Sequence, residues 1–210
     1  MGYGWGLLFG RPMNYLRLFV ARHGETDWNA QARAQGISDI DLNDKGRAQA
    51  AKLVDRYQFY NFDGIYCSAL KRTQQSVEGL NAKTPLTVVP ELNEQSLGSF
   101  EGKLMDEDEG RIRQEFVRRI TDPNDSLDGG ESREEHRKRV ARGLEKILDA
   151  HETGQVFIMG HGGTNTLILA ELFSWDTLNA AQFFQRNCEV FAFDIFENGH
   201  INFWQELLIE

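Results

Sequence analysis

The 210-residue sequence has few of the features that mark a specialised class of protein. Its only two cysteines, Cys67 and Cys188, provide no disulfide framework and favour a reducing compartment. No apolar run approaches the roughly 18 residues of a membrane-spanning helix. With 23 Lys and Arg against 32 Asp and Glu, the net charge of −9 lacks the basic excess that broad nucleic-acid binding requires. We therefore expect a cytoplasmic protein that binds neither nucleic acid nor a membrane.

What the sequence does contain is typical of a globular domain. Hydrophobic residues make up 40% and charged residues 26%, which is ordinary for a globular protein. A chain of this length is expected to form one large domain with a substantial core. The first residues, MGYGWGLLFGRP, have neither the basic start nor the cleavage site of a secretory signal. We expect residues 1–12 to be an N-terminal extension of a single domain spanning 13–210. The apolar side chains of this extension leave two alternatives open, packing on the core or association into a homodimer.

Short β-favouring runs alternate along the chain with helical patterns. Asn43 is predicted to begin one helix, Ser68 to cap another that runs through Leu80, and Thr164–Phe173 to form a third. Strands are predicted at Leu16–Ala21, Phe62–Cys67, Leu86–Val89, Val156–Met159, Val190–Ile195 and Ile201–Leu208. This alternation predicts an α/β fold, a three-layer sandwich whose central sheet is mixed but mostly parallel, with helices on both faces.

The segment at about 101–131 differs from the rest of the chain. Acidic and basic residues alternate densely, and Asp122–Asp125 and Asp128–Gly130 carry turn signals. These features predict a helical and loop excursion from the domain. Arg118 and Arg119 are predicted to lie on its solvated face, with the alternative that they reach a pocket.

Two histidines occupy matching positions at the ends of predicted strands. His23 and His161 each follow an apolar strand closely, and each is followed by glycine. In parallel sheets, ligands bind at the carboxyl ends of the strands, where glycine permits close approach and helix N-termini attract anions. We therefore expect both histidines to face one anion-binding pocket. No function is assigned to the histidines that lack this context, which are His136, His151 and His200.

Arg72 is expected at the same edge of the sheet, because it lies four residues after Ser68 at a strand end. A guanidinium group can hold a phosphate through two parallel hydrogen bonds. A phosphate dianion is costly to remove from water without nearby cations. Arg22, Arg72 and a protonated His161 would supply that positive charge.

These residues belong to a longer series of motifs that resembles a known family. The motifs are Arg22-His23-Gly24-Glu25-Thr26, Asn29, Gln35-Gly36, Asp39, Asp41-Leu42, Gly46, Ser68-Ala69-Leu70-Lys71-Arg72, Leu92-Asn93-Glu94, Gly98, Phe100-Glu101-Gly102 and Gly160-His161-Gly162-Gly163. Their order and spacing over roughly residues 14–207 are similar to those of the histidine phosphatase superfamily, the phosphoglycerate-mutase-like group.

The resemblance implies a role for each matched residue. His23 would be the nucleophile that takes up the phosphoryl group, and Glu94 the general acid. Glu94 is preferred over Glu25, Glu91 and Glu101 because its spacing to the Phe100 motif fits the family. No metal and no organic cofactor is implied. The implied phosphate-binding set consists of Arg22, Asn29, Arg72, His161 and the backbone N–H of Gly162.

Two departures from the family favour hydrolysis over phosphoryl transfer. Leu97 and Met105 stand where mutase members usually have tyrosine and lysine, groups that would hold a second acidic part of the substrate. Phe100 stands where the family usually has tryptophan, which is a mild change at a packing position. The sequence therefore predicts a metal-independent phosphomonoesterase acting on a small phosphorylated metabolite. A bisphosphate-dependent mutase and a phosphate-binding module without turnover are the alternatives. A cysteine-based phosphatase is disfavoured because only four residues separate Cys67 from Arg72.

Overall fold

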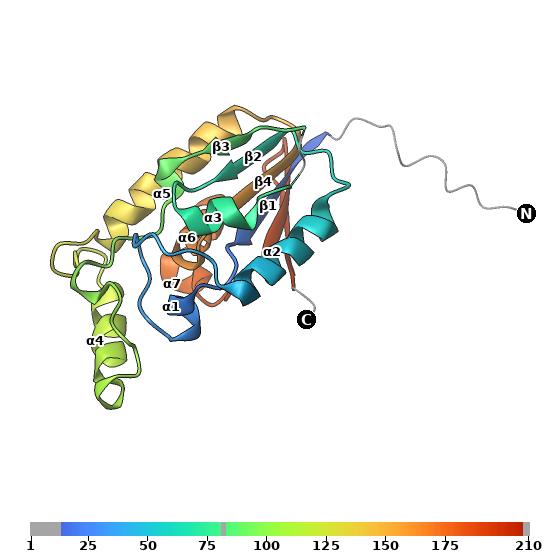
Figure 1. Cartoon of the computed structure of the whole chain (residues 1–210). Coiled ribbons are helices and arrows are strands. Elements are labelled where there is room, and N and C mark those ends of the chain that lie inside the picture. Colours follow the sequence, from blue (N-terminus) through green and yellow to red (C-terminus); the bar gives the residue numbers. More distant parts are fainter. Residues whose placement is uncertain (1–13, 81–82, 208–210) are drawn as a thin grey trace, which may run out of the picture.

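A six-stranded mixed sheet forms the centre of the molecule in the computed structural model, which describes residues 14–80 and 83–207 (Figure 1). The sheet order is β3-β2-β4-β1-β5-β6, and the first four of these strands are mutually parallel. β5 and β6 run antiparallel to their neighbours, which confirms the predicted mostly parallel, mixed sheet. The strands are β1 (Tyr15–Arg22), β2 (Gly64–Cys67), β3 (Leu86–Val88), β4 (Gly154–Gly160), β5 (Val190–Phe196) and β6 (Ile201–Glu206).

Helices cover both faces of this sheet, as predicted. α2 packs on one face, whereas α5 and α6 pack on the other (Figure 1). The described part of the chain also contains 3₁₀ turns at Pro90–Leu92, Gly98–Phe100 and Asp108–Gly110. The helices are α1 (Asp27–Ala30), α2 (Asp44–Tyr57), α3 (Lys71–Ser76), α4 (Arg111–Ile120), α5 (Arg133–Asp149), α6 (Gly162–Phe173) and α7 (Thr177–Ala180).

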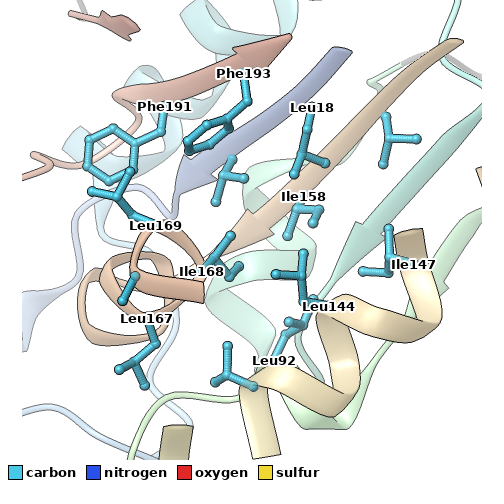
Figure 2. Packing of buried hydrophobic residues seen from close by; sticks show 14 of the residues in the cluster. Leu18, Leu92, Leu144, Ile147, Ile158, Leu167, Ile168, Leu169, Phe191 and Phe193 are labelled. Carbon is cyan, nitrogen blue, oxygen red and sulfur yellow. The ribbon is translucent and has the colours of Figure 1, made fainter. Parts of the chain in front are cut away.

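Side-chain alternation along β1 divides the core into two layers. Leu18 and Val20 join the cluster against α5 and α6, whereas Phe19 and Ala21 join the cluster against α2. Figure 2 shows the first cluster, in which Leu18 lies near residues of β4, β5 and both helices. Each fully buried aliphatic or aromatic side chain stabilises the fold by about 1.5–3 kcal/mol. The central strands are therefore stabilised by packing on both faces of the sheet.

The register of β1 against β4 determines where the two predicted histidines lie. Arg22 at the end of β1 pairs with Gly160 at the end of β4 in a parallel register. The next residues, His23 and His161, therefore leave the sheet side by side. The His23 backbone N–H also donates to the Gly160 carbonyl oxygen at 3.1 Å, which extends the ladder by one bond.

The two predicted helix caps have different outcomes. Asn43 caps α2, because its Oδ1 accepts a hydrogen bond from Gly46 N at 2.8 Å. The prediction that Ser68 caps a helix through Leu80 is wrong, since α3 spans only Lys71–Ser76 and follows Leu70. The Ser68 hydroxyl instead contacts Thr73 and a histidine of the site, as described below.

The excursion after residue 101 extends away from the sheet and carries α4 (Figure 1). Its inner side packs as a small apolar cluster that includes Phe100, Leu127 and Phe116. Arg119 pairs with Asp125 at 2.7 Å and with Asp128 at 2.6 Å, so it closes the following loop. The predicted extension 1–12 and its suggested role in a homodimer lie outside the described residues. No helix within 14–80 and 83–207 is long and apolar enough to cross a membrane.

Candidate active site

His23 is a buried, neutral imidazole whose orientation is set by the backbone. Its Nδ1 lies 2.7 Å from the Gly24 carbonyl oxygen, which can only accept, so Nδ1 carries the hydrogen. The lone pair is therefore on Nε2. Burial, followed by the charges of Arg72 and Arg22, holds the pKa of His23 well below its ordinary value. The ring is thus an uncharged base and nucleophile at neutral pH.

His161 lies beside it, with the two ring centroids 5.2 Å apart. Arg72 Nε donates to His161 Nδ1 at 3.2 Å, and His161 Nε2 donates to Ser68 Oγ at 2.8 Å. Burial and the charge of Arg72 hold the pKa of His161 well below its ordinary value. The prediction of a protonated His161 is therefore wrong, because Nδ1 acts as an acceptor and cannot also carry a hydrogen.

Arg72 is fully buried behind His161. Its Nη1 donates to the Ser38 carbonyl at 2.8 Å, and its Nη2 donates to the Gly36 carbonyl at 2.7 Å. Burial lowers the pKa of Arg72 to about 10, so the guanidinium remains charged at neutral pH. In this structure Arg72 fixes His161 and the loop at 36–38, and its predicted two-pronged contact with phosphate stays a prediction.

A cavity of about 400 Å³, here called the catalytic cavity, opens beside His23. Five of the seven predicted residues line it: Arg22, His23, Asn29, Glu94 and Gly162. His161 and Arg72 are not among its lining residues. α6 begins at Gly162, so the partial positive charge of a 12-residue helix is directed toward this cavity. Sequence positions from both halves of the chain thus meet at one edge of the sheet.

Arg22 supplies a charged wall of the catalytic cavity. Its Nη1 donates to the Gln185 carbonyl at 2.7 Å, whereas its buried Nε has no hydrogen-bond partner. A buried unpartnered donor is costly, and an anion bound in the cavity would satisfy it. Asn29 lies nearby and donates from Nδ2 to Gln35 Oε1 at 2.9 Å.

Glu94 lines the same cavity, and hydrogen bonds to its carboxylate oxygens fix its position. Its Oε2 accepts from the Gly163 backbone N–H at 2.9 Å, and its Oε1 accepts from Gln95 N at 3.0 Å and Thr164 Oγ1 at 3.3 Å. A Cβ on Gly163 would lie 2.7 Å from Glu94 Oε1. The approach of the carboxylate to the start of α6 therefore requires glycine at this position.

Sequence reasoning missed His136, to which it assigned no function. His136 is 1% exposed and lines the catalytic cavity, with Nε2 3.1 Å from Thr164 Oγ1 and 3.8 Å from Glu94 Oε1. Burial and the charge of Arg139 lower its pKa to about 3, so it is neutral. A signal was present, because His136 precedes Val140 by four residues on the apolar stripe of α5.

Arg139 is a second residue that sequence reasoning missed. Its Nη1 donates to the carbonyls of Glu91 and Asn93, both at 2.8 Å, and its Nη2 reaches the Glu94 carbonyl at 3.3 Å. It also pairs with Glu131. Arg139 thus fixes the backbone that carries Glu94. This contact spans 45 residues of sequence, and nothing local in the sequence indicates it.

The rivals of Glu94 are engaged elsewhere. Glu25 pairs with Lys45 at 2.9 Å, and Glu91 pairs with Lys146. Glu101 accepts from Ile37 N at 2.9 Å and from Ser38 Oγ at 2.7 Å, so it holds a loop. None of the three lines the catalytic cavity.

The buried thiol of Cys67 does not suit a cysteine nucleophile, because burial raises its pKa to about 12. Within residues 14–80 and 83–207, no three His, Cys, Asp or Glu side chains are arranged to hold a metal ion.

Comparison with known proteins identifies the family. A family profile described as "Histidine phosphatase superfamily (branch 1)" matches residues 18–206. The Arabidopsis thaliana protein "Phosphoglycerate mutase-like protein 4" is 32% identical, covering 72% of this chain and 68% of the relative. The Bacillus subtilis "Uncharacterized phosphatase PhoE" is 31% identical, covering 75% of this chain and 77% of the relative.

A solved structure from Escherichia coli agrees on the fold. This putative alpha-ribazole-5′-P phosphatase has a TM-score of 0.79 and 24% identity, and the match covers 94% of this chain and 100% of that one. The family match spans nearly all the described residues and includes both strand-end histidines. The chain belongs to the histidine phosphatase superfamily, whose named relatives are phosphatases and mutase-type enzymes.

Proposed function

We propose that the protein is a metal-independent phosphomonoesterase that acts on a small phosphorylated metabolite through a phosphohistidine at His23. The observation that carries this proposal is the hydrogen bond from His23 Nδ1 to the Gly24 carbonyl at 2.7 Å. It leaves a neutral Nε2 lone pair on a ring that lines the same cavity as the Glu94 carboxyl. A nucleophile and an acid–base group are thus present at one site.

In the first step, His23 Nε2 attacks the phosphorus of the ester. The N–P bond forms while the bond from phosphorus to the leaving oxygen breaks, and protonated Glu94 gives its proton to that oxygen. The charge on the equatorial oxygens is stabilised by the unpartnered Arg22 Nε and the first turn of α6. The Gly24 carbonyl keeps the hydrogen on Nδ1 and stabilises the positive charge that develops on the ring.

In the second step, a water molecule attacks the phosphorus atom that is bonded to His23 Nε2. Glu94, now a carboxylate, takes a proton from this water as the N–P bond breaks. Inorganic phosphate leaves, and His23 returns to its neutral form. The contacts of Glu94 with Gly163 N and Thr164 Oγ1 support this double role, because they hold the carboxyl at the edge of the catalytic cavity.

Hydrolysis is favoured over a bisphosphate-dependent mutase reaction. Leu97 and Met105, which replace the usual tyrosine and lysine, are buried in the apolar cluster with Phe100. They therefore offer no hydrogen bonds to a second acidic group at those positions. The phosphatase name of the Bacillus subtilis relative supports the same choice.

The test is hydrolysis of p-nitrophenyl phosphate with and without a chelator by the wild type and by His23→Ala. We expect turnover that the chelator does not reduce and that falls by at least about 10⁴-fold in the variant, as when other covalent nucleophiles are removed. Equal phosphate release by the two proteins would exclude His23 as the nucleophile. Absence of release by either protein would favour the binding module.

A second assay separates the phosphatase from the mutase. Bisphosphate-dependent interconversion of 2- and 3-phosphoglycerate that is faster than phosphate release would overturn the proposed hydrolysis.

A further inference from the structure

A second cavity of about 420 Å³, here called the basic cavity, adjoins the catalytic cavity. The two share Arg22, Asn29 and Phe184 among their lining residues. In a protein with a net charge of −9, this cavity is rich in cations. Five cations line it, which are Arg22, Arg33, Lys45, Arg113 and Arg186, whereas its acidic residues are Glu25 and Glu189.

Three of these arginines form no ion pair within the described residues. Arg22 donates to the Gln185 carbonyl, and Arg33 donates to Gln31 Oε1 and to the Gly102 carbonyl, both at 2.7 Å. All three acceptors are neutral. The guanidinium of Arg186 has no partner in residues 14–80 and 83–207.

Several arginines outside this cavity do form ion pairs. Arg17 pairs with Asp194 at 2.6 Å, and Arg139 pairs with Glu131 at 2.5 Å. Three guanidinium groups without an ion pair in the described residues thus line one cavity, although the protein has a surplus of carboxylates. Charges of one sign that line a cavity raise the local concentration of ligands of the opposite sign.

The two carboxylates of the basic cavity are already engaged. Glu25 accepts from Lys45 at 2.9 Å and from Asn43 Nδ2 at 3.0 Å. Glu189 is 5% exposed and accepts from the Arg186 backbone N–H at 2.8 Å and from Gln205 Nε2 at 3.1 Å. Burial lowers the pKa of Arg22, and the charges of Glu94 and Glu189 oppose this shift, but Arg22 and Glu189 form no ion pair. A surplus of positive charge thus remains on this cavity.

We propose that the basic cavity binds a second phosphate of the substrate. The leaving group of the ester would then carry at least one phosphate of its own, held by Arg33 and Arg186 while the reacting phosphate lies at His23. Guanidinium groups suit this ligand because they bind phosphate oxygens in pairs. The substrate class is therefore a metabolite with more than one phosphate group, an identification that rests on the proposed hydrolysis at His23.

Direct binding tests the cavity without turnover. Calorimetry would compare orthophosphate, which can occupy one cavity, with tripolyphosphate, which carries several linked phosphates. We expect tripolyphosphate to bind at least about tenfold more tightly to the wild type, as charge-assisted hydrogen bonds imply. The Arg33→Gln/Arg186→Gln variant should lose most of this difference while its orthophosphate affinity stays within about twofold. The single Arg186→Gln variant is a second test that should not disturb folding, because this side chain is exposed and has no partner among the described residues.

Two control variants separate this site from general charge effects. Arg118→Gln removes the same charge from an exposed position on α4 that does not line the basic cavity. Arg133→Gln removes a half-buried guanidinium that lines the catalytic cavity. Both should retain the preference for tripolyphosphate. Equal affinities for the two probes in the wild type, an equal loss in Arg118→Gln, or a loss confined to Arg133→Gln would each overturn the proposal.

A kinetic comparison then links binding to the reaction. We expect kcat/KM for fructose 1,6-bisphosphate to exceed that for fructose 6-phosphate, and Arg186→Gln to reduce the first several-fold more than the second. Tight tripolyphosphate binding without hydrolysis of any ester would refute the proposed reaction and leave the basic cavity standing. Hydrolysis without any preference for tripolyphosphate or for the bisphosphate would refute the second phosphate site and leave the proposed reaction standing.

Discussion

The buried polar groups around His161 hydrogen-bond to one another, whereas Arg33 and Arg186 at the opening of the site form no ion pair within the described residues. In this buried group, here called the floor, Arg72, His161 and Ser68 form one chain of hydrogen bonds, and the Arg72 guanidinium donates from all three of its nitrogens. At the opening, here called the rim, Arg186 has no partner in the described part of the chain and Arg33 contacts only neutral groups. The comparison separates a floor that is preorganised for chemistry from a rim whose charge is available to a ligand.

Arg72→Ala should have the largest effect among the floor variants, because it removes three hydrogen bonds at once. The buried carbonyls of Gly36 and Ser38 would lose their donor, and His161 would lose its support. We expect kcat on p-nitrophenyl phosphate to fall about 10²–10³-fold and the free energy of unfolding to fall by about 2–5 kcal/mol. Steady-state kinetics and urea unfolding measure both. A variant within twofold of the wild type in rate would show that neither Arg72 nor its support of His161 matters for the reaction.

Gly163→Ala should reduce kcat by about 10²-fold, because the new Cβ would lie 2.7 Å from Glu94 Oε1 and displace the carboxyl. Gly162→Ala is the matched control, since its Cβ would meet Arg22 only at 3.6 Å, an ordinary contact. The control should lose far less activity. Equal losses of kcat in the two variants would mean that Gly163 is not required to position the Glu94 carboxyl.

Acid should destabilise the folded protein through its three buried histidines. His23, His161 and His136 have pKa values below the ordinary 6.5, so the folded protein leaves them unprotonated where the unfolded chain binds protons. Unfolding then takes up protons, and the free energy of unfolding decreases as pH falls below about 6.5, by up to about 1.4 kcal/mol per pH unit for each histidine.

Urea unfolding between pH 7 and pH 5 measures this dependence, and His136→Gln should reduce its slope by about one third. A stability that does not change over this interval would contradict the neutral state of the three rings.

Arg186→Gln should have the smallest effect on simple substrates. Its side chain is exposed and has no partner in the described residues, so we expect kcat/KM for p-nitrophenyl phosphate to stay within about twofold and the stability to change by less than about 0.5 kcal/mol. A loss as large as that of Arg72→Ala would remove the distinction between floor and rim.

The sequence was sufficient for the parts of the site that depend on local patterns. The apolar runs that end at Arg22 and Gly160 predict the ends of two strands. In the structure these ends pair in parallel, which brings His23 and His161 together. Glu94 and Asn29 were found only through the family motifs. Their placement in the catalytic cavity agrees with the expectation, while their roles stay predictions.

Contacts between distant segments were not predictable from local patterns. Ser68 resembled a helix cap because serine after a strand commonly begins a helix, but its hydroxyl contacts His161, which is 93 residues away in the sequence. The basic cavity combines residues from α4, from the start of α2 and from the loop before β5. Its charge is visible only after these segments have come together.

The pairing of Arg22 with Gly160 has a consequence for how this site tolerates changes in chain length. Backbone ladder bonds, rather than contacts between the imidazoles, set the spacing of the two rings. Deleting one residue within Val156–Met159 would shift His161 by about 3.3 Å along β4 and reverse the face on which its side chain emerges. The residue count of these two strands therefore determines whether the two rings face each other.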